Sequence, residues 1–169
     1  DFCDLHSAVL DGSIDLQGAK DVFPGHPVDT FIKENTAVRR QIETYKETSK
    51  DIDRISDSEI SGYILKLRTI FNNLSDIDKH YKRKEYLLFP FLEKHLITGP
   101  PKVMWGKHDE TRELLKKSHE ILTSSISKAV ELKSALKGTL NIAVERIEGM
   151  IMKEEEILFP MAIDTLNEE

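Results

Sequence analysis

The sequence predicts an all-α protein, an up-down-up-down four-helix bundle with a short helical N-terminal extension. Two observations support this fold class. The chain of 169 residues is rich in Glu, Lys, Leu and Ile, with 39 % hydrophobic and 32 % charged residues, a composition typical of helical proteins. Apolar residues also recur at helical spacing over four stretches of at least about 20 residues. This length is sufficient for one domain with its own core.

The first helix is predicted to open at His26-Pro27, because Pro suits the first helical turn. Before it, residues 1–24 are interpreted as short helical pieces, either the end of a truncated N-terminal helical domain or a linker. They end at a Phe-Pro-Gly turn, residues 23–25. The bundle itself is therefore expected to span residues 25–169.

The second helix is expected to follow a polar break between residues 48 and 58 and to be capped by Asp57 or Ser58. Its apolar positions continue past His80 to about His95. Because proline cannot donate a backbone hydrogen bond, we expect a kink at Pro90.

Two more helices are expected in the second half of the chain. The Gly-Pro-Pro sequence at residues 99–101 is interpreted as the clearest break, so the third helix is predicted to start near Trp105 or Gly106 and to run to about Ala135. Gly138 is expected to separate it from a fourth helix over about residues 139–167. This last helix is predicted to kink at Pro160.

The second and fourth helices carry the same motif 70 residues apart. The two copies are Glu85-Tyr86-Leu87-Leu88-Phe89-Pro90 and Glu155-Glu156-Ile157-Leu158-Phe159-Pro160. The duplication is imperfect upstream of the prolines. Met150 stands at the position equivalent to His80, and Glu154 at the position equivalent to Lys84.

Four residues, one on each helix, form a coherent set of metal-ligand candidates: His26, His80, His108 and Glu154. Neutral imidazoles with one carboxylate suit Fe, Zn, Mn or Co, and two His with one carboxylate suit non-haem Fe(II). Four-helix bundles build such sites from inward-facing side chains. A structural alternative is an ion pair between Lys84 and Glu154, because a buried carboxylate needs a cation or a proton. A lone His near a helix terminus is also commonly a cap or a core residue.

Composition excludes several classes of function. The formal net charge of −6 argues against a nucleic-acid partner. The apolar runs are far shorter than a membrane span, and the start of the chain does not resemble a signal peptide. The single Cys fits a reducing cytoplasm, and the missing initiator Met indicates a fragment or a processed chain. No nucleophile–base pair, phosphate loop or nucleotide fingerprint is present, so whether the chain is an enzyme stays undecided, and an iron-dependent redox activity stays open.

The repeated motifs with His80-Tyr81 and Glu154-Glu155 resemble the hemerythrin-like (HHE cation-binding) family. A second block, residues 99–110 together with His26-Pro27-Val28, resembles an uncharacterised bacterial and archaeal subfamily whose members often carry a PAS sensor domain. Residues 1–16 resemble the end of that subfamily's own N-terminal helical domain. The resemblance covers essentially the whole chain.

The resemblance implies a non-haem di-iron site that binds dioxygen, senses oxygen, iron or redox state, or handles nitric oxide. His26, His80 and His108 match the single-His positions of the first three helices, and Glu154 matches the bridging carboxylate of the fourth. Lys84 replaces the other bridging carboxylate. In such sites the first two helices supply the His ligands of one iron, which leaves a mononuclear site of His26, His80 and Glu154, with His108 as a fourth ligand or a remnant. A second metal would have to recruit Glu85 or Glu155.

Two function hypotheses follow. The first is a cytoplasmic metal-binding module, with mono- or dinuclear non-haem iron or alternatively zinc or manganese, that senses or handles oxygen, nitric oxide or redox state. An adjacent sensor domain or a second copy of the chain would read its state. The alternative is a metal-free helical interaction or regulatory module with a degenerate site and a Lys84–Glu154 pair inside. A weaker idea assigns haem or metal capture to Cys3 and His6.

Overall fold

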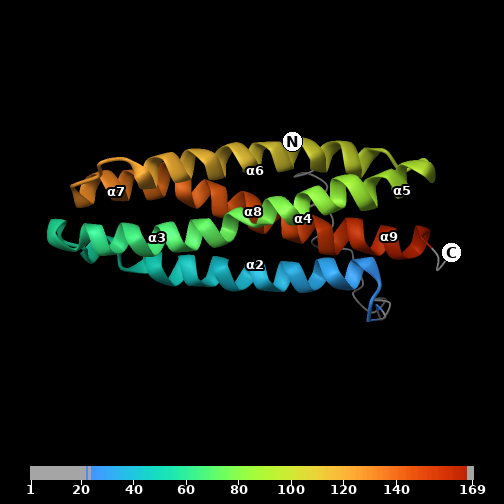
Figure 1. Ribbon diagram of the computed structural model, residues 1–169, viewed down its shortest axis with the longest axis horizontal. Helices are drawn as coiled ribbons and strands as arrows, with labels where there is room; N and C mark the ends of the chain where they lie inside the picture. Colours follow the sequence, from blue (N-terminus) through green and yellow to red (C-terminus); the bar gives the residue numbers. More distant parts are fainter. Residues whose placement is uncertain (1–21, 23, 167–169) are drawn as a thin grey trace, which may run out of the picture.

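The chain folds as a bundle of four antiparallel helical segments in up-down-up-down order (Figure 1). A computed structural model describes residue 22 and residues 24–166. The expectations for residues 1–21, including Cys3 and His6, lie outside the described residues. The first and third segments are single helices, whereas the second and fourth are interrupted or widened along their length. The elements are α2 (Pro27–Lys50), the 3₁₀ turns η2 (Ile52–Arg54) and η3 (Asp57–Glu59), α3 (Ile60–Ser75), α4 (Ile77–Arg83), the π-helical turn η4 (Lys84–Leu88), α5 (Phe89–Lys94), α6 (Gly99–Thr123), α7 (Ala129–Ala135), the π-helical turn η5 (Leu136–Leu140), α8 (Asn141–Lys153), the π-helical turn η6 (Glu154–Leu158) and α9 (Phe159–Thr165).

The start of the first helix is confirmed. Pro27 occupies the first turn of α2, and the Nδ1 atom of His26 accepts a hydrogen bond from the backbone N–H of Val28 at 3.1 Å. This contact satisfies one of the backbone donors that a helix start leaves open. The predicted polar break follows α2. There Ser56, rather than Asp57 or Ser58, forms a capping box with Glu59.

The two repeated prolines are each preceded by a π-helical turn. Pro90 follows η4 and Pro160 follows η6, and in each turn the backbone N–H of the Phe before the proline bonds to a carbonyl five residues earlier. A proline lacks an N–H group and its ring crowds the carbonyl four residues before it. The wider turn accommodates both effects inside an otherwise continuous helical segment. The same backbone device therefore accompanies both copies of the motif.

The predicted boundaries of the third and fourth helices are wrong. Gly99, Pro100 and Pro101 do not break the chain but form the first turn of α6, where proline costs no hydrogen bond. The break comes earlier, at residues 95–98. At its other end α6 stops at Thr123 rather than near Ala135.

The fourth helical segment starts at Ala129, about ten residues before the predicted start. Its start is fixed by Glu131, whose carboxylate accepts hydrogen bonds from the backbone N–H groups of Ser127 and Lys128. Gly138 lies inside the π turn η5 and does not separate two helices. The Glu131 cap decides where the segment starts, and the lone glycine is tolerated within it.

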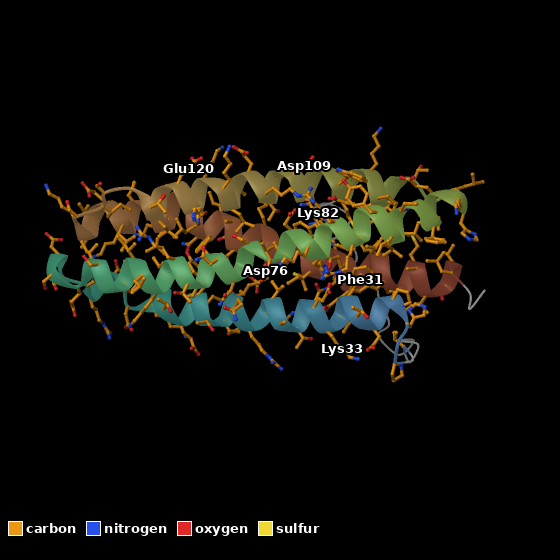
Figure 2. The ribbon with its side chains drawn as sticks, in the orientation of Figure 1. Phe31, Lys33, Asp76, Lys82, Asp109 and Glu120 are labelled. Carbon is orange, nitrogen blue, oxygen red and sulfur yellow. The ribbon has the colours of Figure 1, made fainter. Side chains whose placement is uncertain are left out.

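The core runs the length of the bundle, where α2 packs on α3 and α8, and α6 packs on the same two helices. Figure 2 shows charged side chains such as Lys33 and Asp109 on the outer faces, whereas Phe31 is buried. Among the described residues, no helix has the length and apolar character needed to span a membrane. Against this apolar background, a group of buried polar side chains lies where the two motif-bearing segments meet.

Candidate metal centre

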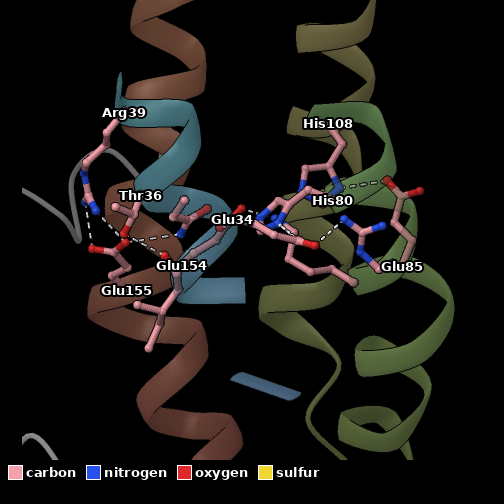
Figure 3. Close-up of polar contacts among 12 residues, drawn as sticks. Glu34, Thr36, Arg39, His80, Glu85, His108, Glu154 and Glu155 are labelled. Carbon is pink, nitrogen blue, oxygen red and sulfur yellow. Dashed lines mark hydrogen bonds and ion pairs between the residues drawn. The ribbon is translucent and has the colours of Figure 1, made fainter. Parts of the chain in front are cut away.

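The π turns η4 and η6 place Lys84 and Glu154 inside the bundle, and both side chains are fully buried. His80, Glu85 and His108 are buried beside them. Figure 3 shows His80, Glu85, His108 and Glu154 projecting from different helices. Buried ionisable groups of this kind are rare unless they are paired, so their contacts determine what the site can do.

The amino group of Lys84 lies at the centre of the cluster. Its Nζ atom contacts Oε1 of Glu154 and lies 3.2 Å from Nε2 of His108. The same atom lies 4.7 Å from the centre of the Tyr81 ring. Lys84 thus joins the second helical segment to the third and the fourth. The predicted ion pair between Lys84 and Glu154 is confirmed as a contact.

On one side of this pair the contacts run toward α2. Oε2 of Glu154 lies 2.9 Å from Nε2 of His80, and Nδ1 of His80 lies 2.7 Å from Oε2 of Glu34. The other oxygen of Glu34 accepts a hydrogen bond from Arg83. His80 therefore bridges two carboxylates, one from the first and one from the fourth segment.

On the other side the contacts run toward the outer face of α6. Nδ1 of His108 lies 2.7 Å from Oε1 of Glu85, and Arg112 donates to Oε2 of Glu85 at 2.9 Å and to Asp78 at 2.7 Å. The ring of Tyr81 stacks on His108 with the ring centres 4.0 Å apart. The imidazole of His108 is thus held both in its plane and across its face.

The contacts follow one rule. Each of the three carboxylates in the cluster, which are Glu34, Glu154 and Glu85, meets one basic side chain and one imidazole. Arg112 also donates to two carboxylates outside the cluster, Asp78 and Asp109. We refer to this connected set as the polar chain. It consists of Arg83, Glu34, His80, Glu154, Lys84, His108, Glu85 and Arg112.

The proton positions in half of the polar chain follow from the pKa directions. Burial lowers the pKa of His80 to about 4, so its imidazole is neutral near pH 7. Burial acts to raise the pKa of Glu34, but the hydrogen bond to His80 and the charge of Arg83 outweigh it and hold that pKa below its ordinary value. Glu34 is therefore a carboxylate that accepts the Nδ1–H of His80. The Nε2 atom of His80 is left as an acceptor facing Glu154.

The hydrogen-bond geometry is complete when the Lys84–Glu154 pair supplies a proton to that acceptor. Burial lowers the pKa of Lys84 well below its ordinary value, against the charges of nearby carboxylates. With the proton on Glu154, its hydroxyl donates to His80 and its other oxygen accepts from Lys84. Lys84 also donates to His108, whose own pKa is lowered by burial and whose Nδ1–H donates to Glu85. Every contact then has one donor and one acceptor, and the pair is neutral overall.

The structure brings three of the four predicted ligand candidates together and leaves the fourth apart. His80, His108 and Glu154 lie around Lys84, whereas His26 caps the start of α2. Of the two residues proposed for a second metal, Glu85 joins the cluster. Glu155 turns away to a bidentate pair with Arg39 at 2.7 Å and to a hydrogen bond from Asn35.

Several members of the polar chain were not identified from the sequence. Arg112 lies one helical turn after His108, so its spacing could have indicated it. Tyr81, which stacks on His108 without belonging to the polar chain, is adjacent to His80 and is buried with it. Glu34 carries no sequence signal, because its role depends on how α2 packs against α4.

An up-down-up-down bundle that gathers imidazoles and carboxylates from its four segments has the architecture in which four-helix bundles build internal metal and ligand sites. Residues 26–162, well over half of the chain, match the family described as the hemerythrin HHE cation binding domain. The chain therefore belongs to the hemerythrin HHE cation-binding family. A comparison with curated proteins finds no match.

The side chains as they are placed do not fit a metal ion. Over residue 22 and residues 24–166, no group of three or more His, Cys, Asp or Glu is arranged to hold one. The cause lies in Lys84, because its amino group already uses Oε1 of Glu154 and Nε2 of His108. Nε2 of His80 is engaged by the second oxygen of Glu154. A metal ion would need these same atoms.

Proposed function

We propose that this domain is a regulatory or interaction module of the hemerythrin family that works without a resident metal ion. One observation carries this proposal: Lys84 lies inside the bundle on Glu154 and His108, the groups that would otherwise face a metal. Wherever their shared proton lies, the Lys84–Glu154 pair is neutral. The buried carboxylate therefore has a partner supplied by the chain itself.

The polar chain gives such a module a means of responding as a unit. It joins α2 through Glu34, the second segment through His80 and Lys84, α6 through His108, and the fourth segment through Glu154. The buried donors and acceptors of the polar chain all find partners only when the helices keep this arrangement. A neighbouring sensor domain or a second copy of the chain would read a shift in that arrangement as a change in the surface of the bundle.

Metal content is the measurement that tests the proposal. The protein would be produced with added iron, purified without oxygen and submitted to elemental analysis, and its urea denaturation would be followed with and without a chelator. We expect no stoichiometric metal and an unchanged free energy of unfolding. Near one or two metal ions per chain, about the content of a mono- or dinuclear site, would contradict a metal-independent role.

An iron-binding sensor is the second candidate, and the orientation of the two imidazoles favours it. In His80 and His108 the Nδ1 atom rests on a carboxylate while Nε2 points toward the Lys84–Glu154 pair. Metal-ligating histidines are commonly held in this way. Such a protein would bind iron, or alternatively zinc or manganese, and respond to dioxygen, nitric oxide or redox state, and Lys84 would have to leave the centre. Loss of a stoichiometric metal on substitution His80→Ala would support this candidate.

A second experiment tests whether the two motif copies are matched correctly. The double substitution Lys84→Glu with Met150→His gives both helical segments the His and Glu pair that the family resemblance leads one to expect. We expect its iron content to rise toward about two per chain. No rise in a folded variant would show that residues 80 and 150, or 84 and 154, are not equivalent. The cytoplasmic location and the identity of any partner stay predictions.

A further inference from the structure

Lys84 and Glu154 hold the same place in the two copies of the motif. Each is the first residue of a π turn that leads to a proline, and each is fully buried. The repeated backbone therefore directs two equivalent positions toward each other across the bundle. One carries an amine and the other an acid, so the two meet as a pair instead of repelling.

The surroundings of Lys84 Nζ are those that a transition-metal ion prefers. Glu154 and His108 contact the amino group, and His80 lies on the far oxygen of Glu154 at 2.9 Å. Two imidazole nitrogens and one carboxylate suit Fe(II), Zn²⁺ or Co²⁺. Behind them, Glu34 and Glu85 hold the two Nδ1 atoms at 2.7 Å.

If the side chain at position 84 only had to fill space, an apolar residue would be more stable there than lysine. Burying an amine costs free energy that an apolar side chain of similar length would avoid. The cost is offset here by two hydrogen-bond acceptors and the face of Tyr81. Removing the side chain would leave a cavity lined by donor atoms, and cavities lined by polar groups hold water or ions.

We propose that the amino group of Lys84 has taken the place of a metal ion in this chain, closing a latent site for a divalent transition metal formed by His80, His108 and Glu154. This inference rests on the proposed metal-independent function and explains it. Lys84 supplies the partner that a cation would otherwise supply. The nitrogen and oxygen atoms of His80, His108 and Glu154 that would bind a metal ion stay gathered around its amino group.

The test is a titration of the full chain with Co²⁺, which reports its ligands through visible absorption. The variant Lys84→Ala is compared with the unaltered chain and with Lys79→Ala. Lys79 is an exposed lysine in the same helical segment that pairs with Asp76. We expect about one Co²⁺ per chain in Lys84→Ala, with a raised melting temperature when Co²⁺ is present. The unaltered chain and the Lys79→Ala variant should bind none stoichiometrically.

Two further variants identify the ligands. Adding His108→Ala to Lys84→Ala should abolish the Co²⁺ absorption band. Adding Glu85→Gln instead should weaken Co²⁺ binding about 10- to 100-fold, because Glu85 orients His108 without touching the ion. Binding that survives His108→Ala would show that the ion sits elsewhere, and would overturn the proposal.

The remaining outcomes separate this inference from the proposed function. If Lys84→Ala folds only when Co²⁺ is present, as followed by circular dichroism, the latent site is supported. If it folds neither with nor without Co²⁺, or folds and binds none, the latent site is wrong while the metal-independent function stands. Stoichiometric binding by the unaltered chain would overturn both.

Discussion

The two copies of the repeated motif share a backbone but differ in chemistry. Both contain a π turn that ends just before a proline, and the first residue of each turn is buried at the centre of the bundle. In the second helical segment that residue is Lys84, and in the fourth it is Glu154. The backbone thus decides which positions face inward, while the side chains decide whether two inward positions form a metal site or a pair.

The second residue of each turn diverges further. Glu85 is buried between His108 and Arg112, whereas Glu155 is partly exposed and pairs with Arg39 on the surface. A sequence repeat therefore predicts equivalent backbone positions better than equivalent roles. The partners on the neighbouring helices, which do not repeat, set those roles.

The largest expected effect on stability comes from placing a carboxylate at the first position of both π turns. Lys84→Glu would place a second carboxylate against Glu154 with no cation between them. We expect it to lower the free energy of unfolding by about 3–5 kcal/mol in urea denaturation. The exchanged pair Lys84→Glu with Glu154→Lys should recover a substantial part of the loss. A double variant no more stable than the single one would show that the two positions are not interchangeable.

Lowering the pH should weaken the part of the polar chain in which His80 contacts Glu34 and Glu154. The pKa of His80 is about 4 in the folded protein because burial disfavours the charged ring, whereas the ordinary pKa of a solvated histidine is 6.5. The unfolded chain then binds more protons between these values. The free energy of unfolding should therefore fall as the pH falls from 6.5 to 4, by about 3 kcal/mol from this residue. His108 acts in the same direction.

Urea denaturation at a series of pH values measures this effect. His80→Asn should flatten the pH dependence between 6.5 and 4. His95→Asn, at an exposed position after α5, serves as the matched control. Equal slopes for all three proteins would show that His80 is not neutral in the folded state.

Comparing the second residue of each turn should give a smaller and unequal pair of effects. Glu85→Gln removes the charge that faces Arg112 and His108, and we expect a loss of about 2 kcal/mol in chemical denaturation. Glu155→Gln weakens an exposed pair with Arg39, and a loss below about 1 kcal/mol is expected. The comparison would fail if the two substitutions cost the same.

The smallest expected effect tests where the central proton lies. Glutamine has the shape of a protonated glutamate, so Glu154→Gln can donate to His80 and accept from Lys84 as the neutral pair does. We expect a change below about 1 kcal/mol. If Lys84 were instead a charged ammonium paired with an ionised Glu154, the same substitution would strand a buried charge and cost about 3–5 kcal/mol. Thermal and urea denaturation distinguish these results.

Much of the fold could be predicted from local sequence patterns. The helical periodicity and the His26-Pro27 start led to the bundle and its first helix, and the repeat located the motif-bearing segments. The sequence prediction divides the third and fourth helices at the wrong places, because it treats glycine and proline as breaks. Proline is tolerated in the first turn of α6, and Gly138 is tolerated within a π turn.

The candidate site was only partly predictable, for a reason that lies in packing. His80, His108 and Glu154 are predicted correctly as candidates supplied by three different helices, and the structure brings them together. His26 is not with them, since the opening of α2 uses its ring as a cap. Glu34 could not be anticipated, because its carboxylate gains a role only when another helix brings an imidazole to it.

The burial of Lys84 also gives the molecule a chemical reporter. Among the described lysines it alone is buried, while most of the others are exposed. Amine-reactive reagents would acylate the exposed lysines quickly and would reach Lys84 only when the helices separate. The rate at which its peptide becomes labelled, followed by mass spectrometry, therefore measures how often the bundle opens at its centre.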